Sequence, residues 1–195
     1  MSVGKIIAVV ACSTNMTDTR VLALVGSLRA DSHNRKIVEA IQAQAPAGVT
    51  VEIAEGLHEI PFYNEELDGE NVPAAAAALR EQVAKADRLL IVTPEYNGST
   101  PAVIANAIDW ASRPYGAGSI KGKPTAVVGT SVGQFGGAWA LANTKKSAGI
   151  AGAAVLEDVD VAHAYAWGSD PAAEADVVAK FVAAVEKLAV YEGIA

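Results

Sequence analysis

Short apolar runs alternate with longer segments of helical period along most of the chain, and this order restricts the fold more than any other feature. The runs lie at residues 21–25, 49–53, 89–92, 125–128 and 153–156, and each is too short for a helix. Strands that alternate with helices over short connections form parallel sheets through right-handed crossovers. We therefore predict an α/β fold, a doubly wound five-stranded parallel sheet with helices on both faces.

The segments after these runs place apolar residues every three or four positions, as amphipathic helices do. Ile37, Val38 and Ile41 show this spacing after the first run. After the third run, Thr100 is suited to cap a helix and Pro101 to open it. The helices are expected at residues 37–45, 74–87, 101–111, 136–148 and 171–190.

Length and composition favour a single folded domain. The chain has 195 residues, of which 51% are hydrophobic and 19% charged, so it has enough apolar side chains to bury a core. We expect this domain to cover residues 21–195. Residues 1–20 are expected to form an N-terminal extension, either as a short strand or as a disordered segment.

Charge, cysteine content and the N-terminal run limit the partners and the compartment. The net charge of −7, without a basic run to offset it, argues against a nucleic-acid partner. Cys12 is alone, which excludes a disulfide framework or a thiolate metal cluster and fits a reducing, cytoplasmic location. The apolar run at residues 6–12 is far shorter than the roughly 20 residues of a membrane span, so we expect no membrane partner. Because the run ends at a cysteine, export is the alternative.

Three polar loops follow predicted strands, at the sheet edge where parallel α/β folds bind ligands. The first loop, residues 26–34, leads from a strand into a helix, where free amides and the helix dipole favour an anion. Ser27, Ser32 and Asn34 add short polar groups, and Arg29 is suited to grip a phosphate.

The first loop also has simpler interpretations. It is compatible with an ordinary turn in which Ser32 caps the helix. Asp31 would repel a phosphate, so we expect its side chain to point outward. The loop lacks both the Walker lysine pattern and the G-x-G-x-x-G fingerprint, which favours a terminal phosphate over a nucleotide pyrophosphate.

The second loop, residues 93–101, contains two prolines, a glycine and a tyrosine. These residues favour a rigid turn with exposed backbone amides, which suits the polar edge of a flat heteroaromatic ring. Asn97 supplies both a donor and an acceptor for such an edge. The alternative is a plain strand-to-helix turn with Tyr96 packed on the surface.

The third loop, residues 129–137, matches the G-x-S-x-G pattern of a serine hydrolase, with Ser131 as the nucleophile. Asp158, Asp160 and His163 follow in the acid-then-histidine order. However, the acids lie only a few residues from the histidine, and no HGGG-type oxyanion segment precedes the serine. A ligand-binding loop is therefore preferred, and the hydrolase stays open as the alternative.

Together the three loops resemble the NADPH-dependent FMN reductase family, which includes bacterial quinone and chromate reductases and flavodoxin-like azoreductases. The resemblance covers residues 21 to about 160. It rests on residues 26–29 with Ser32 and Asn34, and on residues 61–64, 94–97 and 106–110.

The resemblance implies a flavodoxin-like fold that holds FMN non-covalently. The residues that it places at FMN are Ser27, Arg29, Ser32, Asn34, Pro94, Glu95, Tyr96, Asn97 and Ser131. Leu28 and His33 of the same first loop are included as FMN-binding candidates, with a solvated residue of the first helical turn as the alternative for His33. In this assignment the first loop holds the phosphate, the second lies along the ring and Ser131 contacts FMN from the third. The implied reaction moves hydride from the co-substrate NAD(P)H, through FMN, to a quinone or similar small acceptor in ping-pong order. It needs no protein nucleophile and no metal, and the relatives imply a homodimer or homotetramer.

Two points qualify the resemblance. Trp139 stands where many relatives carry an arginine, which affects expectations about nicotinamide contacts, acceptor choice and assembly but not the FMN loops. A one-electron flavodoxin carrier would share the fold and is a further alternative. Flavodoxins usually have a phosphate loop rich in threonine and glycine, so Arg29 favours the reductase.

Overall fold

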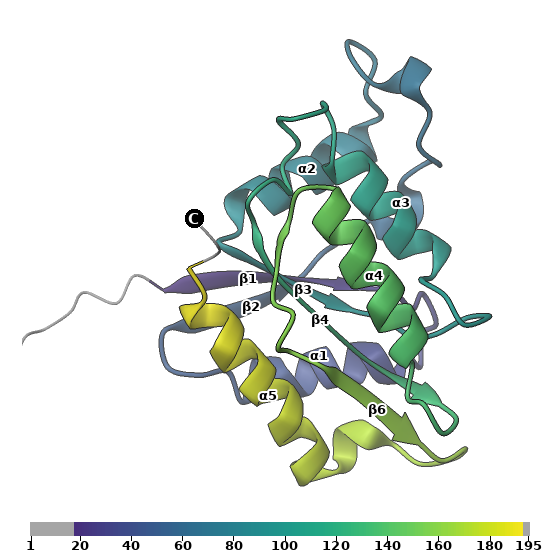
Figure 1. Cartoon of the computed structure of the whole chain (residues 1–195), viewed down its shortest axis with the longest axis vertical. Helices are drawn as coiled ribbons and strands as arrows, with labels where there is room; N and C mark the ends of the chain where they lie inside the picture. The colour runs from purple at the N-terminus through teal and green to yellow at the C-terminus, as the bar shows by residue number, and fades with distance from the viewer. Residues whose placement is uncertain (1–17, 193–195) are drawn as a thin grey trace, which may run out of the picture.

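A computed structural model of the chain describes residues 18–192 and contains one parallel sheet with helices on both faces (Figure 1). The strand order is β2-β1-β3-β4-β5, and β6 also pairs with β4. The strands are β1 (Thr19–Val25), β2 (Val49–Ile53), β3 (Arg88–Val92), β4 (Pro124–Val132), β5 (Ala154–Val155) and β6 (Val161–Tyr165). The helices are α1 (His33–Ala43), α2 (Ala74–Lys85), α3 (Ala102–Ala111), α4 (Ala138–Ile150) and α5 (Ala175–Val190). Every strand pair in the described residues is parallel, which confirms the predicted doubly wound α/β class.

Within residues 18–192 the sheet has six strands where five were predicted. The reason is that β4 is long enough to pair with two strands, one after the other, along the same side. β5 pairs with the start of β4, and β6 pairs with its end, from Val128 to Val132. The prediction missed β6 because alanine and histidine dilute the apolar pattern there. β4 extends beyond the predicted residues 125–128 and therefore includes Ser131.

Helix starts differ from the predictions where proline or glycine controls the backbone. α3 starts directly after Pro101, which is its N-cap residue. Thr100 does not cap this helix; its hydroxyl oxygen lies 2.9 Å from that of Thr144 on α4. α4 starts two residues later than predicted because Gly136 and Gly137 have φ values of 58° and 95°, which end any helical path before them.

Each face of the sheet has its own apolar core, because neighbouring side chains on a strand point to opposite faces. Leu89 and Ile91 of β3 pack in the core under α2, α3 and α4, whereas Leu90 and Val92 pack in the core under α1 and α5 (Figure 1). All four side chains are fully buried, as expected for a strand covered on both faces. Each such burial stabilises the fold by about 1.5–3 kcal/mol.

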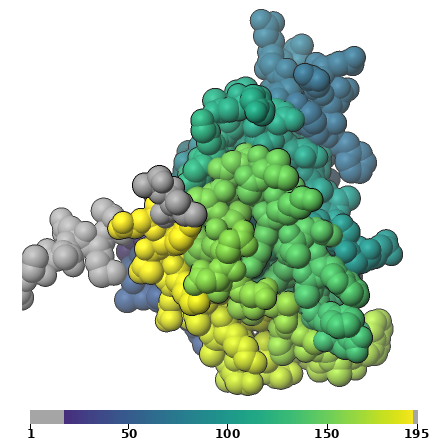
Figure 2. All heavy atoms as spheres, in the orientation of Figure 1, coloured from purple at the N-terminus to yellow at the C-terminus, as the bar shows by residue number. Residues whose placement is uncertain are grey.

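The segment between β2 and α2 projects from the body of the molecule (Figures 1 and 2). Asn106 of α3 fixes its base: the Asn106 side-chain oxygen accepts a 2.9 Å hydrogen bond from the amide of Tyr63. The Asn106 side-chain nitrogen donates to the carbonyls of Ile60 and Pro61. Two of the segments that carry the family resemblance are therefore joined in the fold.

The apolar run at residues 6–12, Cys12 and most of the expected extension 1–20 lie outside the described residues. β1 begins at Thr19, two residues before the predicted strand. Among the described helices, none has the length and the apolar character needed to cross a bilayer.

Close backbone contacts bring the three polar loops to one edge of the sheet. At Gly129 of β4, a Cβ atom would lie 2.0 Å from the carbonyl oxygen of Thr93, so only glycine allows this approach. At Gly26, after β1, a Cβ atom would lie 2.9 Å from both Pro94 and Ile104. The loops after β1, β3 and β4 therefore lie against one another.

Candidate functional site

Nine of the eleven predicted site residues line one hollow of about 270 Å³ at the carboxyl ends of β1, β3 and β4. These nine are Ser27, Arg29, Ser32, His33, Asn34, Pro94, Glu95, Tyr96 and Ser131. Thr130, Val132 and Tyr165 complete the lining. Leu28 lines a neighbouring hollow instead, and Asn97 lies at the tip of its turn without lining any of the described hollows.

The first loop presents a row of free backbone donors. None of the amides from Ser27 to Asn34 donates a hydrogen bond to another group in the described part of the chain. Ser32 caps α1, as one interpretation of the loop predicted, because its side-chain oxygen accepts a hydrogen bond from the amide of Arg35. Ser32 is buried, yet its hydroxyl proton is available to a second partner. Free amides at the start of a helix are the donor set that a phosphate requires.

Charged side chains surround this row of amides. The guanidinium of Arg29 donates a 2.6 Å hydrogen bond to the carbonyl of Asp31, which holds it over its own loop. The side chain of Asp31 is 77% exposed and points outward, as predicted, to pair with Lys36. This pairing lowers the pKa of Asp31 and raises that of Lys36, so both groups carry their charges at neutral pH.

Asn34 joins the first loop to the third. Its side-chain nitrogen donates to the carbonyl of Thr130 at 2.9 Å, and its oxygen accepts from the amide of Thr130 at 3.0 Å. Asn34 is only 4% exposed. The structure thus gives Asn34 a bridging position between α1 and β4, and its predicted contact with a phosphate stays a prediction.

The second loop is a tight hairpin. Tyr96 and Ser99 exchange two backbone hydrogen bonds, and Asn97 and Gly98 between them have φ values of 53° and 67°. Two consecutive positive φ values define a type I′ turn, for which the pair Asn-Gly is the strongest sequence signal. The turn leaves the Tyr96 ring about half exposed at the hollow.

Glu95 connects the second loop to the helix that follows the third. Its carboxylate accepts a 3.0 Å hydrogen bond from the amide of Ala140, in the first turn of α4. A negative charge at this end of a helix is stabilised by the helix dipole. Glu95 therefore fixes the position of α4 relative to the hollow, a role that sequence spacing did not suggest.

Ser131 does not have the surroundings of a hydrolase nucleophile. It lies within β4, in register with Ala164 of β6, and not at a sharp strand-to-helix turn. His163 pairs in register with Thr130, so its side chain lies on the face of the sheet opposite to that of Ser131. Burial, followed by the charge of Lys180 on α5, lowers the pKa of His163. The hydrolase alternative is therefore not favoured.

The two acids of that alternative are also engaged elsewhere. Asp158 forms a 3.1 Å ion pair with Lys187, and Asp160 lies 4.0 Å from Lys145. Neither contacts His163 among the interactions of the described residues.

Sequence reasoning missed the wall that β6 contributes to the hollow. Tyr165 ends β6, and its ring packs edge-on against the ring of His33 with 4.8 Å between centroids. Burial raises the pKa of Tyr165, so its hydroxyl stays protonated at neutral pH. Val161 and Tyr165 are residue types that favour strands, and they are the weak signal that the sequence offered for β6.

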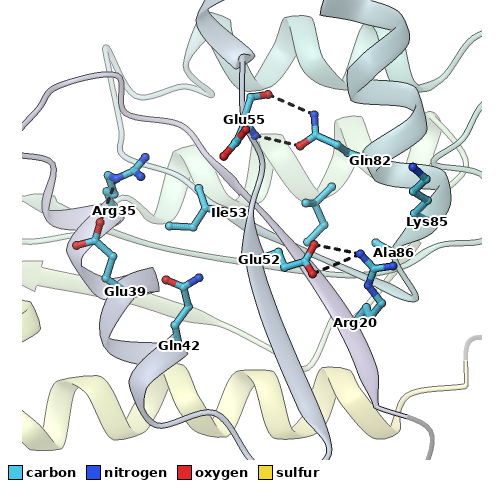
Figure 3. Close-up of a pocket in the computed structure, with 11 residues that line it drawn as sticks. Arg20, Arg35, Glu39, Gln42, Glu52, Ile53, Glu55, Gln82, Lys85 and Ala86 are labelled. Atoms are coloured by element: carbon cyan, nitrogen blue, oxygen red, sulfur yellow. Dashed lines mark hydrogen bonds and ion pairs between the residues drawn. The ribbon is translucent and has the colours of Figure 1, made fainter.

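Two larger hollows lie along the edge strand β2. One, of about 590 Å³, is lined mostly by charged and amide side chains that contact one another (Figure 3). Arg20 pairs with Glu52 at 3.2 Å, and the side chain of Gln82 accepts a hydrogen bond from the amide of Glu55. Because these groups satisfy one another, this hollow has the character of a solvated surface groove.

The other larger hollow has a volume of about 710 Å³ and adjoins the candidate site. It shares Ser27 and Arg29 with the site and is also lined by Leu28 and His58. The first loop therefore borders two hollows, the candidate site and this neighbouring one.

The comparisons with known proteins agree with the geometry. A family model described as NADPH-dependent FMN reductase matches residues 19–168. The chain belongs to this family. The resemblance drawn from the three loops is thereby confirmed.

Named relatives share more than 40% of their residues with this chain over the matched segments. A quinone reductase of Pseudomonas putida is 45% identical over 117 residues, which are 60% of this chain and 62% of that protein. A 2-hydroxy-1,4-benzoquinone reductase of Burkholderia sp is 43% identical over 126 residues, which are 65% of this chain and 68% of that protein. The match thus spans about 62% of the length of the Pseudomonas relative.

Solved structures confirm the flavodoxin-like fold. The flavoenzyme NAD(P)H:(acceptor) oxidoreductase FerB of Paracoccus denitrificans has a TM-score of 0.74 and 34% identity, covering 90% of this chain and 100% of that one. A protein of Agrobacterium tumefaciens described as a flavodoxin, WrbA-like, has a TM-score of 0.56 at 17% identity, covering 88% of this chain and 95% of that one. At this identity the likeness concerns the fold alone.

Proposed function

We propose that this chain is an FMN-dependent oxidoreductase that moves hydride from NAD(P)H to a quinone or similar small acceptor. The observation that carries the proposal is the hollow in which three loops, distant in sequence, place nine predicted FMN contacts together. Family membership and relatives named as quinone reductases support it.

The residues of the hollow fit FMN. The free amides of residues 27–34 and the hydroxyls of Ser27 and Ser32 form a donor set for the phosphate, with Arg29 beside them. Pro94, Tyr96 and the other second-loop residues would lie along the ring. The chemistry that bound FMN would supply is to accept hydride from the nicotinamide and to pass two electrons to the acceptor.

The protein's own part is to bind, orient and admit the reactants. Asn34 and Glu95 hold the loops in place through contacts with Thr130 and Ala140. Tyr96, which lines the hollow, is about half exposed to solvent. We propose that donor and acceptor enter there in turn, which gives ping-pong kinetics.

We further propose a homodimer or homotetramer in the cytoplasm. Tyr96, Phe135 and Trp139 are each about half exposed, and the rings of Phe135 and Trp139 lie 4.9 Å apart. Exposed aromatic residues grouped beside a site are typical of a surface that another chain covers. This supports assembly through the side of the molecule where α4 begins.

The proposal is tested with the purified full-length protein. We expect it to retain FMN, to show a flavin absorption band that bleaches when NADPH or NADH is added without oxygen, and to reduce a benzoquinone with steady consumption of the nucleotide. A protein that binds FMN but does not turn over NAD(P)H would support the one-electron carrier instead. A protein that neither retains nor rebinds FMN would contradict the proposal.

A further inference from the structure

A carboxylate from the C-terminal part of the chain reaches the first turn of α1. Asp170 precedes η3, a 3-10 turn at Pro171–Ala173, and its Oδ1 accepts a 3.1 Å hydrogen bond from the amide of Ala172. This cap fixes the direction of the carboxylate. Its two oxygens lie 3.3 Å from Nδ1 of His33 and 3.3 Å from Nζ of Lys36.

His33 is held from two sides. Its side chain is only 16% exposed and lines the candidate site, next to the free amides of the first loop. Asp170 contacts its Nδ1, and the ring of Tyr165 packs against it edge-on. Without these contacts, the two side-chain torsions of a histidine allow several ring positions.

We propose that Asp170 is a positioning residue for the phosphate end of the FMN site, which it serves by holding the imidazole of His33 at the hollow. The inference rests on the proposed function. The family match ends at residue 168, before Asp170, so family membership does not assign Asp170 this role. The assignment comes from its contacts across 137 residues of sequence.

Charge and position predict opposite effects when Asp170 is neutralised. As a negative charge near a phosphate, Asp170 opposes binding, so its removal alone would strengthen the affinity for FMN. As a positioning residue it keeps His33 in place, so its removal weakens that affinity. The sign of the change therefore distinguishes the two roles.

Asp31 supplies a matched control. It pairs with the same lysine, Lys36, but is not among the contacts of His33. Asp31→Asn removes the same charge from the same neighbourhood without releasing the imidazole. We expect Asp31→Asn to leave the affinity for FMN unchanged or to increase it.

The experiment titrates the FMN-free full-length protein with FMN and with riboflavin, which lacks the phosphate, and follows flavin fluorescence. We expect Asp170→Asn to weaken FMN binding about fivefold to tenfold, the range expected when one ordinary hydrogen bond is lost, and to leave riboflavin binding unchanged. Asp170→Glu should restore part of the loss. Tighter FMN binding, or equal losses for FMN and riboflavin, would overturn the inference.

A second measurement separates a positioning role from general damage to the fold. In a His33→Ala background, Asp170→Asn should cost less FMN affinity than it does in the wild type, because the group that it positions is already gone. Fully additive losses would overturn the role of His33. Failure of the wild type to bind FMN would instead contradict the proposed function, so the two failures are distinguishable.

Discussion

The side chain of Asn34 on α1 holds Thr130 of β4 by both of its backbone groups, at 2.9 Å and 3.0 Å, across 96 residues of sequence. Backbone groups near the end of a strand otherwise pair with a neighbouring strand or with water. Here an amide side chain pairs with these groups and ties the first loop to the third loop. This bridge makes Asn34 a structural member of the site, whatever it contributes to a ligand.

We predict that Asn34→Ala lowers the free energy of unfolding by at least about 1–3 kcal/mol, because it leaves buried groups of Thr130 unsatisfied. Urea denaturation measures this loss. The control is Asn143→Ala, whose exposed amide makes only 3.4 Å contacts with Gly98 and Ser99 and should change stability by less than about 0.5 kcal/mol. Equal effects of the two substitutions would contradict the bridging role.

Arg29→Ala should weaken FMN binding roughly tenfold or more, since a charge-assisted contact to a phosphate contributes about 1.5–3 kcal/mol. Fluorescence titration of the FMN-free protein checks this. Arg20→Ala is the matched control, because Arg20 lies at the other end of β1 and pairs with Glu52. An unchanged affinity in Arg29→Ala would remove this side chain from the phosphate site.

Ser32→Ala should weaken FMN binding and also destabilise the protein. The affinity falls because a phosphate donor is lost, and stability falls by about 0.5–2 kcal/mol because Ser32 caps α1. Thermal unfolding without FMN isolates the second effect. A variant with full affinity for FMN would show that the hydroxyl serves only as a cap.

Ser131→Ala should keep substantial NAD(P)H oxidation, and an organophosphate probe should not label the wild-type protein. The reason is that Ser131 lies within β4, and His163 is on the other face of the sheet. Mass spectrometry of the treated protein provides the measurement. Stoichiometric labelling at Ser131, together with an esterase activity that the alanine variant loses, would restore the hydrolase alternative.

Initial rates should give parallel double-reciprocal lines when donor concentration is varied at several acceptor concentrations, and excess acceptor should inhibit. Both results follow if the two reactants bind in turn in the one hollow that Tyr96 lines. The hollow of about 710 Å³ that shares Ser27 and Arg29 offers the competing arrangement. Intersecting lines, with both ligands bound at once, would show that two pockets are used.

Acid should weaken the contact between the segment after β6 and α1. Burial raises the pKa of Asp170, but hydrogen bonds from Ala172, Lys36 and His33 outweigh this and leave the pKa below its ordinary value. A carboxyl whose pKa is lowered in the folded state stabilises the fold at pH values above its ordinary pKa of about 3.9. This stabilisation disappears as the pH falls through the folded-state pKa. Because the carboxylate is partly exposed, the contribution should be below about 1 kcal/mol.

Urea unfolding at pH 7 and near pH 3 measures this effect. The wild type should lose more stability between the two values than Asp170→Asn, which has no carboxylate to protonate at that position. An identical pH dependence in both proteins would show that the contact contributes nothing to stability.

Local sequence determined the elements and several of their ends. Alternating and continuous apolar runs predicted five of the strands, Ser32 was recognised as a possible cap, and the turn around Asn97 was expected. These features depend on residues within a few positions of one another, where side-chain period and backbone preference act directly. The same short motifs identified the family and nine of the residues that line the site.

Only the tertiary structure decided which side chains meet across long stretches of sequence. The contacts of Asn34 with Thr130, of Glu95 with Ala140 and of Asp170 with His33 join elements separated by 45 to 137 residues. No period or spacing encodes such partners, because they depend on how the helices settle on the sheet and where β4 ends. The strand β6 belongs to the same class: its sequence is a weak strand signal, and pairing with the long β4 makes it a strand and a wall of the site.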